Sequence, residues 1–422
     1  MIAALLALVL TAGALPPNVL LISVDTLRAD SLGCYGSPLP ASPNLDRFAQ
    51  ESRLFEDCVC EVPLTLPSMG SMLSSRFPRT TGTRRNGLKM PKDTPLVTEQ
   101  FKAAGYYTFC VQSNWTLKAK LCGLDRGFDV YEDGFHTKRW GIVKPERYAD
   151  EVNRVALDLL KNRPADKPFF AWVHYSDPHA PYRKHHEYNP TGIKFWQWNK
   201  KDRVRARYAS EVAYADAHAG QLLAALPENT AIVFTADHGE SLYEHNYLGH
   251  GRRVHQTNIH IPLIIHAPGV AAGRTKTPVS GIDIGPTLLA LAGLSKANGM
   301  LGMNLLDSSL PFSRTRVVET YGGAVPNVPG AKAILAERRP MRQSVLLDGW
   351  KLILNGNEAE LYYLPNDPME EHDLARNDPG RIEPLRALIK QWNKATHSQP
   401  DTTGETLSPD DLQALESLGY IK

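Results

Sequence analysis

Two stretches of this chain share one design, a run of apolar and mostly β-branched residues that ends at an acidic side chain. In residues 18–26, the run NVLLISV leads to Asp25. In residues 231–240, the run AIVFTA leads to Asp237 and then His238. Buried parallel strands read as nearly continuous apolar runs, and open α/β sheets bind ligands at the carboxyl ends of their strands. We therefore expect both carboxylates at one edge of a parallel sheet.

Two carboxylates delivered to one edge from distant parts of the chain indicate a metal site. Taken singly, either Asp25 or Asp237 could instead cap a helix that follows its strand, since Asp is a favoured N-cap residue. The pair and the motifs between them favour the metal site.

Strand-like runs alternate with helical patterns through most of the chain. This alternation predicts an α/β fold with a mainly parallel central sheet flanked by helices, over residues 17–315. The expected strands are 18–25, 106–112, 168–174, 230–236 and 260–266, and the expected helices are 43–52, 68–75, 96–104, 146–162, 205–226 and 284–292.

The pattern changes after about residue 315. Residues 342–354 read as two strands around the Asp348-Gly349 turn, and residues 360–364 read as a third strand. A helix is expected over 380–396. We therefore predict a C-terminal subdomain, residues 316–397, with a small antiparallel sheet and one helix. A polar tail, residues 398–422, should end in a short helix from Pro409 to Leu418.

The composition is that of an ordinary globular protein. The chain has 422 residues, 42% of them hydrophobic, and a formal net charge of +2, which gives no sign of a nucleic-acid surface. Residues 1–14 are apolar and end in Ala-Gly-Ala, which is typical of a signal peptide. We expect export to the periplasm or the extracellular space, with no integral membrane segment after cleavage. Because the usual positive charge before the apolar run is missing, a misassigned start or a membrane tether stays open.

Five cysteines are present, so at least one thiol is unpaired in an exported chain. On a strand, Cys58 and Cys60 would point to the same face, which favours a packing role. Cys110 and Cys122 could form a disulfide across the intervening loop.

A threonine between the two acidic strand ends is the candidate nucleophile. In the segment VPLTLPSMGSML, residues 62–73, Thr65 precedes Pro67 and a helical pattern. Its hydroxyl would lie at a helix amino terminus, where backbone N–H groups and the helix dipole favour an anion. The alternative is that Thr65 or Ser68 is simply the N-cap of that helix.

These motifs carry a family resemblance. The segments VLLISVDTLRADSLGCYG, TLPSMGSMLSSRFPRTTG, LDRGFDVY, FFAWVHYSDPHAPY and TADHGESLYEHN, in this order, resemble the sulfatase family of the alkaline-phosphatase-like superfamily. The similarity runs from residue 18 to about residue 375. It includes KLILN and ELYYLPNDPMEEHDL, which are typical of the family's small C-terminal subdomain.

The resemblance implies one divalent metal ion held by Asp25, Asp237 and His238. It makes Thr65 the nucleophile and the fourth contact of the metal. A metal beside a hydroxyl lowers the pKa of the hydroxyl and holds an anionic ester oxygen.

The resemblance also assigns roles to histidines. His250 corresponds to a residue that binds substrate oxygens or assists the leaving group, and His179 to a substrate contact that His174 would support. For each histidine alone, a satisfied loop or core residue is an equally good interpretation. We expect such a structural role, and no catalytic one, for four further histidines: His245, His255, His260 and His266.

Three departures from the family pattern bear on the chemistry. Sulfatases carry Cys or Ser, converted to formylglycine, where this chain has Thr65, and the supporting arginine is replaced by Met69. Threonine is not a known precursor of that aldehyde. The metal site loses an oxygen ligand at Thr26 and gains the His238 imidazole, which favours Mn²⁺ or Zn²⁺, with Ca²⁺ and Mg²⁺ as alternatives. The family's lysine is replaced by Asn114, a hydrogen-bond donor to substrate.

Three functions are compatible with these residues. The first is hydrolysis or transfer of sulfate or phosphate esters through a covalent intermediate on Thr65, as in the superfamily's phosphodiesterases and phosphonate ester hydrolases. The second is a sulfatase that works by another route. The third is an inactive sulfatase-like protein that binds anionic glycans or lipid head groups. The expected substrate is a sulfated or phosphorylated small molecule, glycan or lipid head group, selected by loops such as 133–145 and 183–204.

Overall fold

The computed structural model describes residues 15–134, 138–139, 142–143, 147–192, 199–322 and 340–399. The expected leader at residues 1–14 and the expected helix at 409–418 lie outside these ranges. So do parts of both loops proposed to select the substrate.

The core of the described chain is an eight-stranded sheet with strand order β13-β2-β12-β9-β1-β8-β4-β5. Its strands are β1 (Asn18–Val24), β2 (Arg53–Phe55), β4 (Tyr107–Val111), β5 (Val130–Glu132), β8 (Phe169–Tyr175), β9 (Thr230–Ala236), β12 (Leu263–His266) and β13 (Gly273–Thr275).

Most of this sheet is parallel, as the sequence predicts. Strand β1 pairs in parallel with β9 on one side and with β8 on the other, and β4 and β5 continue the parallel run. The strand expected at 260–266 is β12, and it runs antiparallel to both β9 and β2. The central strands are buried on both faces, which explains their continuous apolar sequences.

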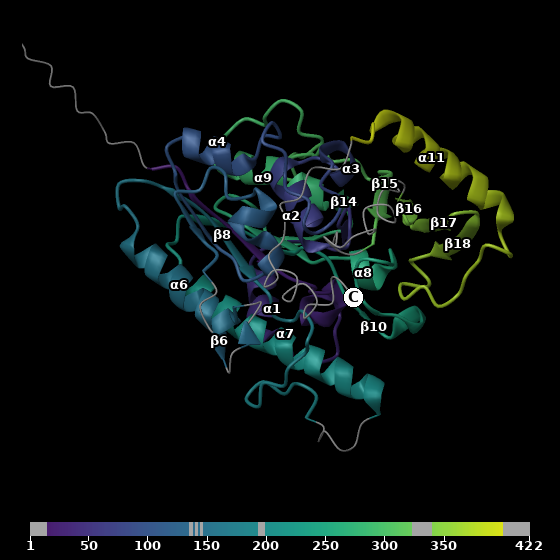
Figure 1. Cartoon of the computed structure of the whole chain (residues 1–422), viewed down its shortest axis with the longest axis horizontal. Helices are drawn as coiled ribbons and strands as arrows, with labels where there is room; N and C mark the ends of the chain where they lie inside the picture. The colour runs from purple at the N-terminus through teal and green to yellow at the C-terminus, as the bar shows by residue number, and fades with distance from the viewer. Residues whose placement is uncertain are drawn as a thin grey trace, which may run out of the picture.

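Helices cover both faces of the sheet (Figure 1). Helices α1 (Pro43–Gln50), α6 (Ala149–Asn162) and α7 (Lys200–Ala224) pack together on one side. Helices α2 (Thr65–Ser74), α4 (Val97–Ala103) and α9 (Ile284–Leu291) pack together on the other. In the described residues of the α/β part, the remaining α-helices are the single turns α3 (Pro78–Thr81), α5 (Ala119–Cys122) and α8 (Gln256–Ile259).

Two helices begin earlier than expected, and each start has a local cause. Helix α7 begins at Lys200 because the Asn199 side chain accepts a hydrogen bond from the Asp202 amide and so caps the helix. Helix α2 begins at Thr65, because a proline such as Pro67 is tolerated within the first turn, where its missing N–H would have no partner.

Short strand pairs also occur in the α/β part, which precedes the C-terminal sheet. They are β3 (Cys58–Val59) with β14 (Val279–Ser280), β10 (Ser241–Leu242) with β11 (Leu248–Gly249), and β6 (Lys138–Arg139) with β7 (Ile142–Val143).

The C-terminal part is a separate antiparallel sheet with one helix, which agrees with the sequence prediction. Its strands are β15 (Arg316–Thr320), β16 (Arg342–Leu347), β17 (Trp350–Asn355) and β18 (Glu358–Tyr363), and its helix is α11 (Ile382–Ala395). Asp348 and Gly349 have φ of +50° and +79°, as a two-residue hairpin turn requires. The domain boundaries themselves remain predictions.

All five cysteines in the described part of the chain are free thiols. The Cys110–Cys122 disulfide is therefore wrong. The Cys122 thiol is already satisfied, because it contacts the Leu117 carbonyl and accepts from the Leu124 amide, both at 3.2 Å. Cys58 and Cys60 are buried in the core, which agrees with a packing role. Among the helices of the described ranges, none has the length and apolar character needed to cross a bilayer.

A buried ion pair of the C-terminal part lies at its contact with the α/β part. Lys351 Nζ lies 2.5 Å from Glu370 Oε1, and both side chains are fully buried. The other carboxylate oxygen of Glu370 accepts a hydrogen bond from the Gln256 amide at the start of α8, at 2.6 Å. Glu370 therefore contacts both parts of the protein.

Replacing Glu370 with alanine should lower the free energy of unfolding by about 3–5 kcal/mol, because Lys351 would keep a buried charge without its partner. Urea denaturation measures this change. The adjacent and exposed Glu371 is the matched control, and Glu371→Ala should change stability by less than about 0.5 kcal/mol. Equal effects of the two substitutions would contradict the role given to the ion pair.

Candidate active site

Strand pairing brings the two predicted acidic residues together. In the register of the sheet, Val24 of β1 is opposite Ala236 of β9, so Asp25 and Asp237 leave neighbouring strands at the same edge. The two residues are also linked directly, since the Thr26 amide donates to Asp237 Oδ1 at 3.0 Å. The His238 amide donates to the same oxygen at 2.7 Å. Both carboxylates are fully buried.

The His238 imidazole has a defined tautomer. Its Nδ1 lies 2.9 Å from the Gly239 carbonyl oxygen, which can only accept, so Nδ1 carries the proton. Nε2 therefore presents a lone pair. It lies 3.8 Å from Asp25 Oδ1 and 3.4 Å from Asp237 Oδ2. A neutral imidazole whose second nitrogen is fixed by a carbonyl is a typical metal ligand.

Thr65 lies beside this group. It is the first residue of α2, and its Oγ1 is 3.5 Å from His238 Nε2. The N-cap interpretation is not supported, because the N-cap position is Leu64 and the Leu66 amide in the first turn donates instead to Asn86 Oδ1 at 2.9 Å. Ser68 has a different task, since its hydroxyl donates to the Asp237 carbonyl at 2.6 Å. The structure thus brings Asp25, Asp237, His238 and Thr65 together.

A metal ion fits this group because several buried ligand atoms have no hydrogen-bond partner among the described residues. Within the described residues, Asp25 Oδ1, Asp237 Oδ2 and His174 Nε2 are buried and accept or donate no hydrogen bond. Asp25, His174 and Asp237 each offer an atom within 4.8 Å of the others. Buried carboxylates without partners are unfavourable, and a cation would satisfy them.

His174 is therefore a further candidate ligand that the sequence interpretation assigned only to support His179. Its Nε2 lies 3.8 Å from Asp25 Oδ2, while its Nδ1 is 2.8 Å from the Ser23 hydroxyl. The signal that could have found it is its position in β8 directly opposite Ser23 of β1, two residues before Asp25.

Asn114 contacts an acidic residue of the site. Its amide nitrogen donates to Asp25 Oδ2, and its amide oxygen accepts from the Thr116 amide at 2.8 Å. These bonds fix the orientation of the Asp25 carboxylate. The printed contacts therefore connect Asn114 to the candidate metal ligands, whereas its predicted contact with substrate stays a prediction.

His179 and His250 lie next to the candidate metal ligands. The His250 ring centroid is 4.5 Å from that of His238 and 5.2 Å from that of His179. His250 Nδ1 lies 3.2 Å from Oε1 of Glu240, a fully buried carboxylate that the sequence analysis did not select. The site thus has a second layer of two imidazoles above the acidic pair.

Burial and neighbouring charges set the pKa values of the acidic groups. Burial alone would raise the pKa of Asp25, but His179, His174 and His238 lower it overall. The pKa of Asp237 is raised by burial and by the nearby Asp25 charge. Two buried carboxylates this close repel each other, which is a further reason why the group suits a cation.

The C-terminal sheet reaches the site through β15. The Thr320 hydroxyl donates to the carbonyl of Gly251, the residue after His250. The Glu319 amide donates to the carbonyl of Glu61, four residues before Thr65, at 2.9 Å. This strand therefore fixes both the segment that leads to Thr65 and the loop that carries His250.

The other histidines have structural partners. His255 Nε2 contacts Glu360 at 2.9 Å, His260 Nε2 contacts the Glu56 carbonyl at 2.9 Å, and His266 Nδ1 contacts the Glu51 carbonyl at 3.0 Å. The ring of His245 stacks on that of His255, with centroids 3.8 Å apart.

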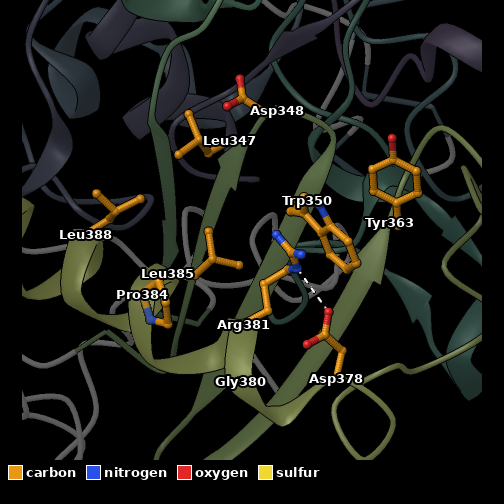
Figure 2. A pocket seen from close by; sticks show the side chains of 10 residues that line it. All are labelled: Leu347, Asp348, Trp350, Tyr363, Asp378, Gly380, Arg381, Pro384, Leu385 and Leu388. Atoms are coloured by element: carbon orange, nitrogen blue, oxygen red, sulfur yellow. Dashed lines mark hydrogen bonds and ion pairs between the residues drawn. The ribbon is translucent and has the colours of Figure 1, made fainter.

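A separate surface hollow of about 680 Å³ lies on the C-terminal part (Figure 2). The Arg381 guanidinium lies 4.0 Å from the centroid of the Trp350 ring, and Arg381 Nε is 3.0 Å from an oxygen of Asp378. The described lining of this hollow comes wholly from the C-terminal part, so it is distinct from the acidic group at the sheet edge.

Comparison with known proteins agrees with this geometry. Residues 17–294 match the family model described as Sulfatase, so the chain belongs to the sulfatase family. The mixed sheet with its small C-terminal antiparallel sheet is the fold of this family's solved structures.

Individual relatives match most of the chain. The uncharacterized sulfatase YidJ of Escherichia coli is 26% identical over 428 residues, covering 85% of this chain and 83% of its own length. An ulvan-active sulfatase of Formosa agariphila is 28% identical over 363 residues, covering 74% and 70%. The crystal structure of the phosphonate monoester hydrolase of Agrobacterium radiobacter superposes with a TM-score of 0.73 at 19% identity, covering 90% of this chain and 96% of that one. At a general level, these matches support a sulfuric or phosphoric ester hydrolase.

Metal content tests the acidic group. We expect purified protein dialysed against Mn²⁺ or Zn²⁺ to retain one ion per chain, and Asp237→Asn to lose it, because one carboxylate charge is removed. Mass spectrometry of the metals measures the ratio. Asp158→Asn, an exposed change on α6, is the control and should retain the ion. Unchanged binding by Asp237→Asn would contradict the assignment.

Proposed function

We propose that this chain hydrolyses or transfers sulfate or phosphate esters through a covalent intermediate on Thr65. The single observation that carries the proposal is the position of Thr65 Oγ1 at the start of a buried helix, 3.5 Å from His238 Nε2. A hydroxyl in this place is next to a group of ligand atoms that suit a cation, which is the arrangement an activated alcohol nucleophile needs.

Asp25, Asp237 and His238 would hold the divalent ion, and Thr65 Oγ1 would be its fourth contact. The bound ion would supply charge stabilisation for the Thr65 alkoxide and for the ester oxygens. The imidazole donors favour Mn²⁺ or Zn²⁺, with Ca²⁺ and Mg²⁺ as alternatives. His174 is an additional candidate ligand on the same side of Asp25.

The proposed reaction has two steps, the formation of a Thr65 ester and its cleavage. Thr65 gives its hydroxyl proton to solvent and attacks phosphorus or sulfur, so an O–P or O–S bond forms while the bond to the leaving group breaks. The leaving alkoxide takes a proton from solvent and departs as the alcohol. Water or a second alcohol then cleaves the Thr65 ester and restores the hydroxyl. His179 and His250 would bind the non-bridging or leaving oxygens, because their rings lie beside the His238 ring.

Phosphoryl transfer is our preferred reaction within this class. A formylglycine mechanism is disfavoured, since Thr65 replaces its precursor and the family's arginine is replaced by Met69, a fully buried core residue. Binding without catalysis is also disfavoured, because a binding module has no need of a buried hydroxyl beside two carboxylates and an imidazole. The named activities of the relatives support an anionic ester as the substrate, whether small molecule, glycan or lipid head group. The leader-like sequence of residues 1–14 supports export.

Substitution of Thr65 tests the proposal. Thr65→Ala should abolish turnover while the protein stays folded and retains its metal, because the nucleophile alone is removed. Thr65→Ser keeps the hydroxyl and should retain measurable activity. Ser74→Ala, which removes a buried hydroxyl at the far end of the same helix, is the control for nonspecific damage and should leave turnover unchanged. Undiminished activity of Thr65→Ala would rule out the nucleophilic role.

The assay should use nitrophenyl sulfate, phosphate, phosphodiester and phosphonate esters in parallel. Preferred turnover of phosphorus esters supports our choice, whereas exclusive turnover of sulfate contradicts it. Rapid acid quench followed by peptide mass spectrometry should find the trapped phosphoryl or sulfuryl group on the peptide that contains residue 65.

A further inference from the structure

Glu240 is a buried carboxylate next to the site. It is neither a candidate metal ligand nor the nucleophile, so the proposed function gives it no role. It is fully buried, and its Oε1 lies 3.2 Å from His250 Nδ1. Its other oxygen, Oε2, is buried as well. Burying a carboxylate is costly, so its presence here needs a specific reason.

The hairpin after β9 places Glu240 opposite His250. Strands β10 and β11 are antiparallel, with Ser241 paired with Gly249. Glu240 directly precedes β10, and His250 directly follows β11, so the two residues form the next pair across the hairpin. Gly239 allows this turn, since a Cβ atom there would lie 2.2 Å from the Thr257 carbonyl oxygen. The contact between Glu240 and His250 therefore follows from the backbone.

The backbone of the His250 loop is held by other groups. The Tyr247 hydroxyl donates to the His250 carbonyl at 2.5 Å. The side-chain amide of Asn258 donates to the Gly249 carbonyl at 3.0 Å, and the Thr320 hydroxyl donates to the Gly251 carbonyl. These bonds place the main chain but leave the rotation of the imidazole unset. Glu240, in contrast, contacts the ring itself.

We propose that Glu240 is the positioning residue of His250. A carboxylate can only accept from Nδ1–H, so it sets both the tautomer and the rotation of the ring. Nε2, on the opposite side of the imidazole, would then be the atom that contacts the ester bound at Thr65. The same division of labour, a carboxylate that orients a functional imidazole, recurs in unrelated enzymes. This inference rests on the proposed function, because it concerns the orientation of a residue that would bind the ester.

A double-mutant cycle tests the proposal. Glu240→Gln keeps the shape of the side chain but removes its charge, and it should lower kcat/KM roughly 10- to 100-fold, the range seen when a carboxylate behind a functional imidazole is lost. In the His250→Ala background, the same substitution should change kcat/KM by less than about twofold, since the ring it orients is gone. Equal losses in both backgrounds, or full activity of Glu240→Gln, would overturn the proposal.

Glu244→Gln is the matched control. Glu244 is a mostly buried carboxylate of the same hairpin, but it pairs with Arg28 Nη1 at 3.1 Å instead of with His250. Its substitution should cost the same loss of kcat/KM in both backgrounds. A cycle for Glu244 as strongly coupled to His250 as that for Glu240 would show that any damage to the hairpin has this effect, and would also overturn the proposal.

A nuclear magnetic resonance measurement separates this proposal from the proposed function and does not need an active enzyme. Wild-type protein with ¹⁵N-labelled histidine should show a hydrogen-bonded Nδ1–H that disappears in His250→Ala and moves upfield in Glu240→Gln. Absence of this signal in the wild-type protein, or an unchanged position in Glu240→Gln, would overturn the role of Glu240. An inactive wild-type enzyme or an active Thr65→Ala variant would instead count against the proposed function.

Discussion

The parallel pairing of β1 with both β8 and β9 is the constraint on which the site depends. Because all three strands run in the same direction, their carboxyl ends deliver Asp25, His174 and Asp237 to one edge of the sheet. The strands themselves are apolar and buried, so the polar residues cannot move apart without disrupting the core. Asp237 is further tied to the β1 end through the Thr26 amide. The sheet thus supports a dense group of charges that a less rigid scaffold would not tolerate.

Around this group, the protein departs from its family resemblance at several positions. Met69 fills the core where the resemblance implies an arginine, and Asn114 contacts the Asp25 carboxylate where it implies a lysine. His238 has its lone pair directed at the acidic pair.

Much of this arrangement could be predicted from the sequence, because it depends on signals that are local. The apolar runs before Asp25 and Asp237 predicted buried parallel strands, and the Asp348-Gly349 pair predicted a hairpin that the structure confirms. What could not be predicted depends on which strands are neighbours. His174 joins the acidic pair only because β8 lies beside β1, and Asn114 turns toward Asp25 from the end of β4. Glu240 was missed for the same reason, since its partner becomes visible only when β10 pairs with β11.

The most direct test of this account is anomalous diffraction from crystals of the protein soaked with Mn²⁺. The account predicts one strong peak bounded by the carboxylates of Asp25 and Asp237 and by His238 Nε2, within coordination distance of Thr65 Oγ1. A peak at another place in the molecule, or a peak here from which Thr65 is turned away, would contradict it.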